Sequence, residues 1–299
     1  MSAFPILLTK EAYDPVSGKM IYQFPSTQTF SNMEVALVNT SFYNSFFNIT
    51  AAFKNNTITV EFPSGSYSGS GSPTYLTRTL TLQDGYYSIE TLNQALQNWF
   101  VNERWFYYDS GSGMNVYFVQ LQTNATLYSA QINCFLVPTA AQAATNGWVV
   151  PTGGAGWTVN AGTTFVAPRV QISTGLGALL GFPASTTSTY TSATWTLTPA
   201  TFLGTAAPAI NMVSGLIMRT NLISQSTGYP VDMLALVPIT SQFGAVTQFV
   251  APHPVFSPIP NGRYTTIDIY FMDQSLRTVK LYDPDITITL EIRERGAPF

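Results

Sequence analysis

Apolar and polar residues alternate with a period of two along much of this chain, and this pattern constrains the fold more than any other feature. In the stretch 286–292, every second residue is isoleucine or leucine, with threonine or glutamate between them. Successive side chains of a β-strand point to opposite faces, so such a stretch buries one face and exposes the other to solvent. The same alternation occurs at 57–62, 194–198 and 266–272. The chain is therefore expected to consist mainly of half-buried strands.

Further strands are expected where β-branched and aromatic residues gather. These stretches are 20–24, 33–43, 75–82, 116–121, 127–136, 165–172, 213–223 and 234–239. Between them, the Ser/Gly stretch 64–72 predicts a flexible loop, and the Ala/Thr/Gly-rich stretch 139–163 predicts a long loop or a small insertion.

Two helices are predicted. Ser88 is a suitable N-cap, and Glu90 follows near the positive helix end. The apolar stripe of the first helix is Ile89, Leu92, Leu96 and Trp99, at helical spacing. A second, short helix fits Thr174 to Leu180, with Gly181 as its C-terminal cap.

Many short strands, few helices and frequent Gly and Pro turns predict an all-β sandwich or barrel. No strand–helix–strand rhythm appears, which argues against Rossmann and TIM-barrel folds. The length of 299 residues is compatible with one large β-sandwich.

Charge is scarce and unevenly distributed. Charged residues make up 9% of the chain, against roughly 25% in a typical soluble protein. None occurs at 110–168 or at 170–218. Two interpretations remain open: a neutral polar surface, or a surface that neighbouring subunits cover. Open sheet edges normally carry charge, so we favour the second.

Composition limits partners and compartment. Twelve Lys and Arg in 299 residues cannot form an extended phosphate-neutralising surface, so sequence-specific nucleic-acid binding is not expected. The longest apolar runs fall far short of the roughly 18 residues of a membrane span. The first ten residues lack a basic segment and contain only a short apolar run interrupted by Pro5, so no signal peptide is expected.

The cysteine and the glycosylation sequons fit a reducing compartment. Cys134 is the single cysteine, so no intrachain disulfide can form, and we interpret it as a small buried hydrophobe. Four Asn-x-Ser/Thr tripeptides begin at Asn39, Asn48, Asn55 and Asn124. In Thr-rich strands such tripeptides arise by chance.

No catalytic, cofactor-binding or metal-binding residue is predicted. Nucleophilic catalysis of the Ser-His-Asp type needs an imidazole, and His253, between two prolines, fits an exposed loop better. One His and one Cys are too few for a zinc site. Asp273, Asp283 and Asp285 leave a turn and a cation site as alternatives, of which the turn is favoured.

Other motifs also favour structural roles. The glycines of 175–181 have the wrong spacing for a dinucleotide fingerprint. Aromatic residues, 14% of the chain, are scattered among the strands and fit a core or an interface better than a carbohydrate platform.

Several segments together resemble the penton (vertex, minor capsid) proteins of virophages and Polinton-like viruses, which belong to the double-jelly-roll capsid lineage. The first two are Asp84–Asn93, which contains the sequence DGYYS, and Leu179–Phe182, which reads LLGF. The next two are Val213–Ile223 and Asp232–Ile239, the latter followed by Phe243-Gly244. The last is Ile267–Arg293, a predicted pair of strands whose connecting segment contains Asp273-Gln274 and Asp285. Their order and spacing are more specific than each motif alone.

The resemblance implies a single jelly-roll β-sandwich that forms homopentamers at the five-fold vertices of an icosahedral virion and contacts the major capsid protein. We expect a short helix after an early strand. We expect residues 1–104 and 211–299 to form the jelly roll and 105–210 to be an insertion or elaboration at its outward end. Synthesis is expected in the host cytoplasm, and a host receptor is a further candidate partner.

Two other classes of function have weaker support in the sequence. A host-attachment or glycan-recognition module is suggested by aromatic residues in Gly-rich segments, Tyr67, Trp148 and Trp157. A jelly-roll enzyme is disfavoured, because the metal-binding histidines of such enzymes are absent. A structural, non-enzymatic capsid protein is the favoured interpretation.

Overall fold

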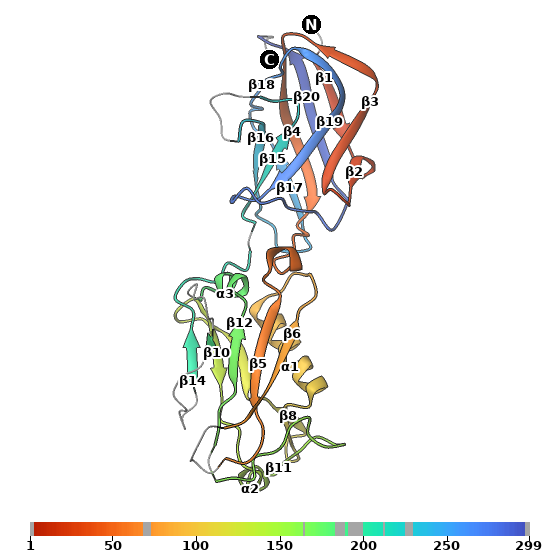
Figure 1. Cartoon of the computed structure of the whole chain (residues 1–299). Helices are drawn as coiled ribbons and strands as arrows, with labels where there is room; N and C mark the ends of the chain where they lie inside the picture. Colours follow the sequence, from red (N-terminus) through yellow and green to blue (C-terminus); the bar gives the residue numbers. More distant parts are fainter. Residues whose placement is uncertain are drawn as a thin grey trace. The chain divides into compact units, whose positions relative to one another are not determined.

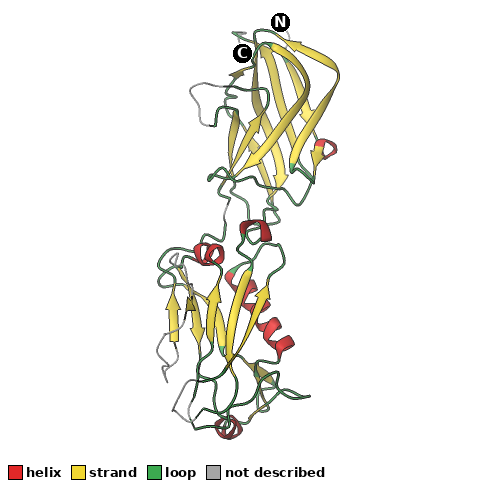
Figure 2. Ribbon diagram, in the orientation of Figure 1, coloured by secondary structure: helices red, strands yellow, loops and turns green. Residues whose placement is uncertain are grey.

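The chain forms two compact units, each built mainly of β-strands (Figures 1 and 2). The computed structural model describes residues 3–67, 73–163, 165–182, 189–190, 200–211, 213–224 and 230–296. Unit 1 comprises Met1–Phe46 and Asn211–Phe299, and unit 2 comprises Phe47–Ile210. The predicted all-β fold is confirmed.

Unit 1 is a sandwich of two antiparallel sheets. The first has the order β1 (Phe4–Leu8), β20 (Thr287–Glu294), β4 (Met33–Tyr43), β17 (Val246–Val250), and β18 (Ser257–Pro258) also pairs with β4. The second has the order β16 (Met233–Pro238), β15 (Gly215–Thr220), β19 (Gly262–Met272), β3 (Lys19–Phe30), β2 (Tyr13–Asp14). A 3-10 turn, η1 (Lys10–Ala12), precedes β2.

The strand order of unit 1 is that of a jelly roll. Numbered along the chain without the short β2 and β18, the strands give the orders 1-8-3-6 and 5-4-7-2. Two Greek keys folded over each other produce this arrangement. Unit 2 is inserted between the third and fourth strands, β4 and β15.

Two strands with the predicted alternation supply much of the jelly-roll core. The inward side chains of β20 and β19 are fully buried: Ile288, Leu290, Ile292, Ile267, Ile269 and Phe271. The intervening threonines, Asp268 and Glu291 are less buried. The period-2 predictions at 266–272 and 286–292 are therefore confirmed, whereas Arg293, predicted on the solvent face, is buried in an ion pair with Glu34.

Within the residues that the structure describes, unit 2 contains three sheets. Their orders are β13 (Thr189–Tyr190), β12 (Arg169–Ile172), β5 (Thr57–Pro63), β6 (Tyr75–Thr81); then β14 (Ala200–Leu203), β10 (Ser129–Cys134), β9 (Val119–Asn124); and β11 (Trp148–Val149), β7 (Tyr107–Asp109), β8 (Met114–Val116). Its helices are η2 (Ala51–Phe53), α1 (Ile89–Glu103), α2 (Ala140–Thr145) and α3 (Thr174–Leu180). Side chains of the first two sheets, α1 and α3 line one small apolar pocket, so these elements pack against one another.

Both predicted helices are confirmed. The Ser88 hydroxyl accepts a hydrogen bond from the Thr91 N–H at 3.2 Å and caps α1. The buried stripe of α1 is Ile89, Leu92, Leu96 and Phe100, so Phe100 takes the place predicted for Trp99. The short helix α3 ends at Gly181, whose φ of 79° is left-handed, as predicted for its cap.

The expected division of the chain at 104/105 was wrong. The first jelly-roll segment ends at Phe46, and β5, β6 and α1 belong to unit 2. The reason is their pairing: β5 is hydrogen-bonded to β12, and α1 packs against β9. Periodicity shows that a strand buries one face but does not show which core receives it.

The predicted strand 194–198 and residues 68–72 of the predicted loop lie outside the described residues.

Replacing Gly181 by alanine is expected to lower the free energy of unfolding of unit 2 by more than about 1 kcal/mol. An added Cβ would clash with the Ala206 carbonyl oxygen, and the residue is left-handed as well. All five tryptophans lie in unit 2, so tryptophan fluorescence during urea unfolding reports this unit. Gly154→Ala is the control, because Gly154 has a φ of 88° but open space around it. Equal losses in the two variants would show that the close contact at Gly181 is unimportant.

Candidate assembly surfaces

His253 and Cys134, the candidate groups for nucleophilic chemistry, belong to different units of the chain. His253 is exposed in the loop after β17, and it makes no hydrogen bond or ion pair with any described residue. Cys134 lies in β10 of the other unit, is fully buried, and burial raises the pKa of its thiol to about 12. A thiol in such surroundings stays protonated and inert.

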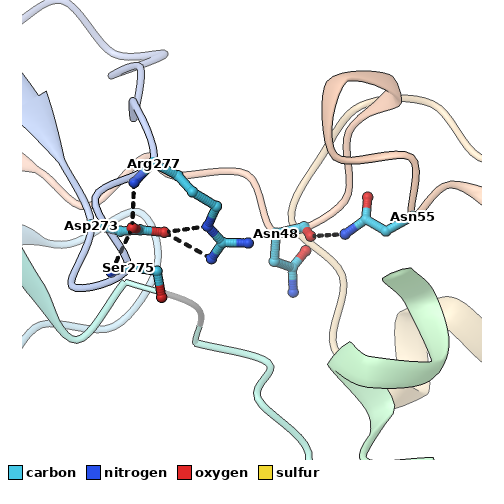
Figure 3. Close-up of polar contacts among 5 residues, drawn as sticks. All are labelled: Asn48, Asn55, Asp273, Ser275 and Arg277. Carbon is cyan, nitrogen blue, oxygen red and sulfur yellow. Dashed lines mark hydrogen bonds and ion pairs between the residues drawn. The ribbon is translucent and has the colours of Figure 1, made fainter. Parts of the chain in front are cut away.

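The three aspartates of the predicted turns make local contacts. Asp283 Oδ1 accepts a hydrogen bond from the Asp285 N–H at 2.9 Å, so the turn interpretation is confirmed there. Asp273 Oδ1 accepts from the N–H groups of Ser275 and Arg277, and its Oδ2 lies 2.7 Å from Arg277 Nη2 (Figure 3). Among the described residues, no three His, Cys, Asp or Glu side chains are grouped so that they could hold a metal ion.

The three aromatic residues considered for attachment do not form an exposed platform. Trp157 is buried, donates its indole N–H to the Arg104 carbonyl at 3.0 Å, and packs edge-on against Phe62. Trp148 is partly buried against Tyr107. Tyr67 is also partly buried. The attachment hypothesis in this form was wrong for Trp157, because a Gly-rich segment can pack its aromatic side chain into a core as well as expose it.

An apolar groove opens between the two sheets of unit 1 at one side of the sandwich. We call it the edge groove; it has a volume of about 340 Å³ and lies between β16 and β17. Leu37, Leu234 and Phe249 line its inner part, and Leu236, His253 and Val255 line its mouth. The Leu236 side chain is 56% exposed, and Val255 is 77% exposed.

The strands beside the edge groove are open sheet edges. Among the described strands, β16 pairs with β15 alone and β17 with β4 alone. Residues 233–262 contain no Asp, Glu, Lys or Arg. Open edges usually carry charges that prevent association, so an uncharged apolar edge is a surface suited to a partner. The lack of charge in this run is visible in the sequence, but its place at an open sheet edge is not.

A second open edge lies at the other end of the same sheet. There β1 pairs with β20 alone among the described strands. Ile6 and Leu8 point into the core, whereas Pro5 is exposed and Leu7 is 59% exposed. Residues 3–9 carry no charged side chain. Unit 1 therefore has two different uncharged edges on opposite sides of one sheet.

Unit 2 has few charges, and most of them are engaged. Residues 47–210 hold nine charged side chains. Arg169 pairs with Glu61 at 3.0 Å and lies over the ring of Tyr75. Arg104 donates to the Gly153 carbonyl at 2.7 Å. The surface of this unit is therefore close to neutral. That neighbouring subunits cover it stays a prediction.

One buried amide joins the two chain ends of unit 2. Asn48, which is 2% exposed, donates to the carbonyls of Tyr87 and Ile210 at 2.8 and 3.0 Å and accepts from the Tyr87 N–H at 2.9 Å. Asn55 donates to the Asn48 carbonyl at 2.7 Å (Figure 3). The first and last residues of unit 2 are thereby held together, and the sequons at Asn48 and Asn55 are structural amides in the folded chain.

Replacing Asn48 by alanine is expected to lower the free energy of unfolding of unit 2 by about 1–3 kcal/mol, because buried backbone groups lose their partners. Urea unfolding followed by tryptophan fluorescence measures this loss. Asn102→Ala is the control, since Asn102 is exposed on α1 and should change stability by less than about 0.5 kcal/mol. An Asn48→Ala protein as stable as the control would contradict the structural role of Asn48.

Comparisons with known proteins gave structural likenesses, two of which are described here. No protein-family model and no curated protein matches the chain. The crystal structure of the mavirus penton protein is similar over 98% of both chains, with 8% identity and a TM-score of 0.44. A chain in the structure of the Sputnik virophage is similar over 99% of this chain and 98% of its own, with 13% identity and a TM-score of 0.38. Within the described residues, no helix is long and apolar enough to span a membrane.

Proposed function

We propose that this chain is a structural, non-enzymatic capsid protein, a penton subunit that forms homopentamers at the five-fold vertices of an icosahedral virion. The observation that carries this proposal is the pair of unlike, uncharged open edges on the jelly roll of unit 1. A closed ring of identical subunits uses two different surfaces on each copy. Interface cores are depleted in charge, because burying an unpaired charge is costly.

The motifs quoted from the sequence support the same role. The segment Asp84–Asn93, the LLGF turn and the last two strands resemble penton proteins in their order and spacing. The chain would be made in the host cytoplasm and reside in the virion. At the vertex its neighbour would be the major capsid protein, towards which the nearly neutral surface of unit 2 is a suitable contact.

Analytical ultracentrifugation of the full chain, alone and mixed with the major capsid protein, tests this proposal. We expect a species with the mass of five chains, either alone or after mixing, and the chain should co-purify with assembled particles. A strict monomer at high protein concentration that is absent from particles would overturn the proposal.

A compatible second role, host attachment, is favoured by one feature of unit 2. Leu127 and Tyr128 form the turn between β9 and β10, are 60% and 72% exposed, and Tyr128 has a left-handed φ of 48°. Strained, exposed apolar residues at a turn often serve recognition. Virions with Leu127→Ser and Tyr128→Ser should bind host cells less well than virions with the control Met114→Ser, which is 66% exposed elsewhere in unit 2. Equal binding would exclude this role.

A further inference from the structure

The two open edges of unit 1 differ in shape. The edge groove is concave, about 340 Å³ in volume, and is lined by leucine, phenylalanine and valine side chains. The edge at β1 instead presents a protruding aliphatic side chain, Leu7, on the exposed face of the strand. A hollow and a protrusion on opposite edges of the same sheet are complementary in form.

Polarity selects β1 over the other edge on its side of the sandwich. The second sheet ends there at β2 and β3, where Asp14 and Lys19 are charged and where the exposed residues Gln23, Ser26 and Thr27 of β3 are polar. Lys280 adds a charge on this side, since its ammonium donates to the Val16 carbonyl in the turn between β2 and β3. The edge groove offers no charged group to any of them, since residues 233–262 carry none. Placing these charges against the groove would desolvate them, and no ion pair or hydrogen bond would offset that cost. The uncharged segment 3–9 avoids that cost.

We propose that neighbouring copies of this chain join through these two edges, with Leu7 of one copy inserted into the edge groove of the next. This inference rests on the proposed capsid function and specifies the surfaces that close the ring. Pro5 has no N–H to donate, so β1 is poorly suited to a backbone ladder with a neighbour. The contact is therefore made by side chains, with Leu7 against Leu236 and Val255.

Disulfide trapping tests the contact on the full chain. Leu7→Cys and Leu236→Cys are combined in one protein, which is oxidised under the conditions that give the five-chain species. Cys134 is buried and inert, so it need not be removed. We expect a ladder of covalent oligomers that ends at the pentamer on a non-reducing gel. The control combines Ile21→Cys with Leu236→Cys, because Ile21 is 40% exposed on β3 rather than on β1; it should give no ladder.

The outcomes separate this inference from the proposed function. A pentamer of the right mass whose Leu7/Leu236 pair does not cross-link would overturn the inference and leave the function intact. A control pair that cross-links as fast as the Leu7/Leu236 pair would overturn it as well. The absence of any pentamer, alone or with the major capsid protein, would overturn both.

Charge exchange gives an independent test. Leu7→Asp or Leu236→Lys alone should raise the concentration needed for half-assembly by about tenfold or more, because each places an unpaired charge in the contact. The double variant pairs the two charges and should recover most of the loss. A double variant that assembles no better than the weaker single variant would contradict the contact between these two positions.

Discussion

Replacing Phe62 by alanine is expected to lower the free energy of unfolding of unit 2 by about 3–5 kcal/mol, the usual loss for a buried phenylalanine. Phe62 is fully buried, its ring stacks on Trp105 with centroids 5.1 Å apart, and it meets Trp157 edge-on at 5.0 Å. Removing the ring leaves a cavity between two large, rigid neighbours that cannot easily collapse into it. Urea unfolding followed by tryptophan fluorescence measures the loss, since every tryptophan lies in unit 2.

Leu127→Ala is the matched control for this variant. Leu127 also belongs to unit 2, but it is 60% exposed, so its truncation should change the free energy of unfolding by less than about 0.5 kcal/mol. A loss below about 1 kcal/mol for Phe62→Ala would show that the aromatic cluster is not the core of unit 2.

Glu34→Ala is expected to cost the jelly roll about 3–5 kcal/mol, because it leaves the Arg293 guanidinium buried without its partner. Arg293 Nε lies 2.7 Å from Glu34 Oε1, and the two side chains are only 10% and 12% exposed. They are direct cross-strand neighbours on β20 and β4, and the guanidinium lies 3.5 Å from the centroid of the Phe256 ring. Amide hydrogen exchange of β4 and β20 measures this loss in unit 1, which has no tryptophan.

Two controls isolate the buried charge as the cause. The double variant Glu34→Leu with Arg293→Met removes both charges and should recover most of the loss. Arg78→Ala breaks a pair with Glu103 in which the side chains are 55% and 33% exposed, and should cost no more than about 1 kcal/mol. If Glu34→Ala were no more costly than Arg78→Ala, the pair would contribute nothing beyond an ordinary surface contact.

Elements with strong local signals were predicted well. Ser88 caps α1 and Gly181 ends α3, because capping depends on neighbouring residues along the chain. The alternations at Ile267–Phe271 and Ile288–Ile292 became buried strand faces. By contrast, β1 and β17 were missed, since each is a short edge strand whose pattern is weak and whose existence depends on a distant partner.

The candidate surfaces were predicted only in part. The scarcity of charge was evident, but it was assigned to 110–168 and 170–218, whereas the uncharged open edge of the jelly roll lies at 233–262. Trp157 was expected to be exposed because it lies among glycines, yet it packs on Phe62 and bonds to the Arg104 carbonyl. Exposure depends on which segments pack together in three dimensions, and a local window does not contain that information.

By itself, the sequence determined the strand-rich class of this protein, its helix ends and its neutral character, since period, capping and charge are properties of neighbouring residues. The tertiary structure alone decided that unit 2 interrupts the jelly roll after Phe46, that Asn48 joins the ends of that unit, and that Leu7 and the edge groove lie on opposite edges of one sheet. Each of these depends on contacts between residues far apart in the chain. Such contacts form only when strands that are distant in the sequence pair with one another and bury their apolar faces together.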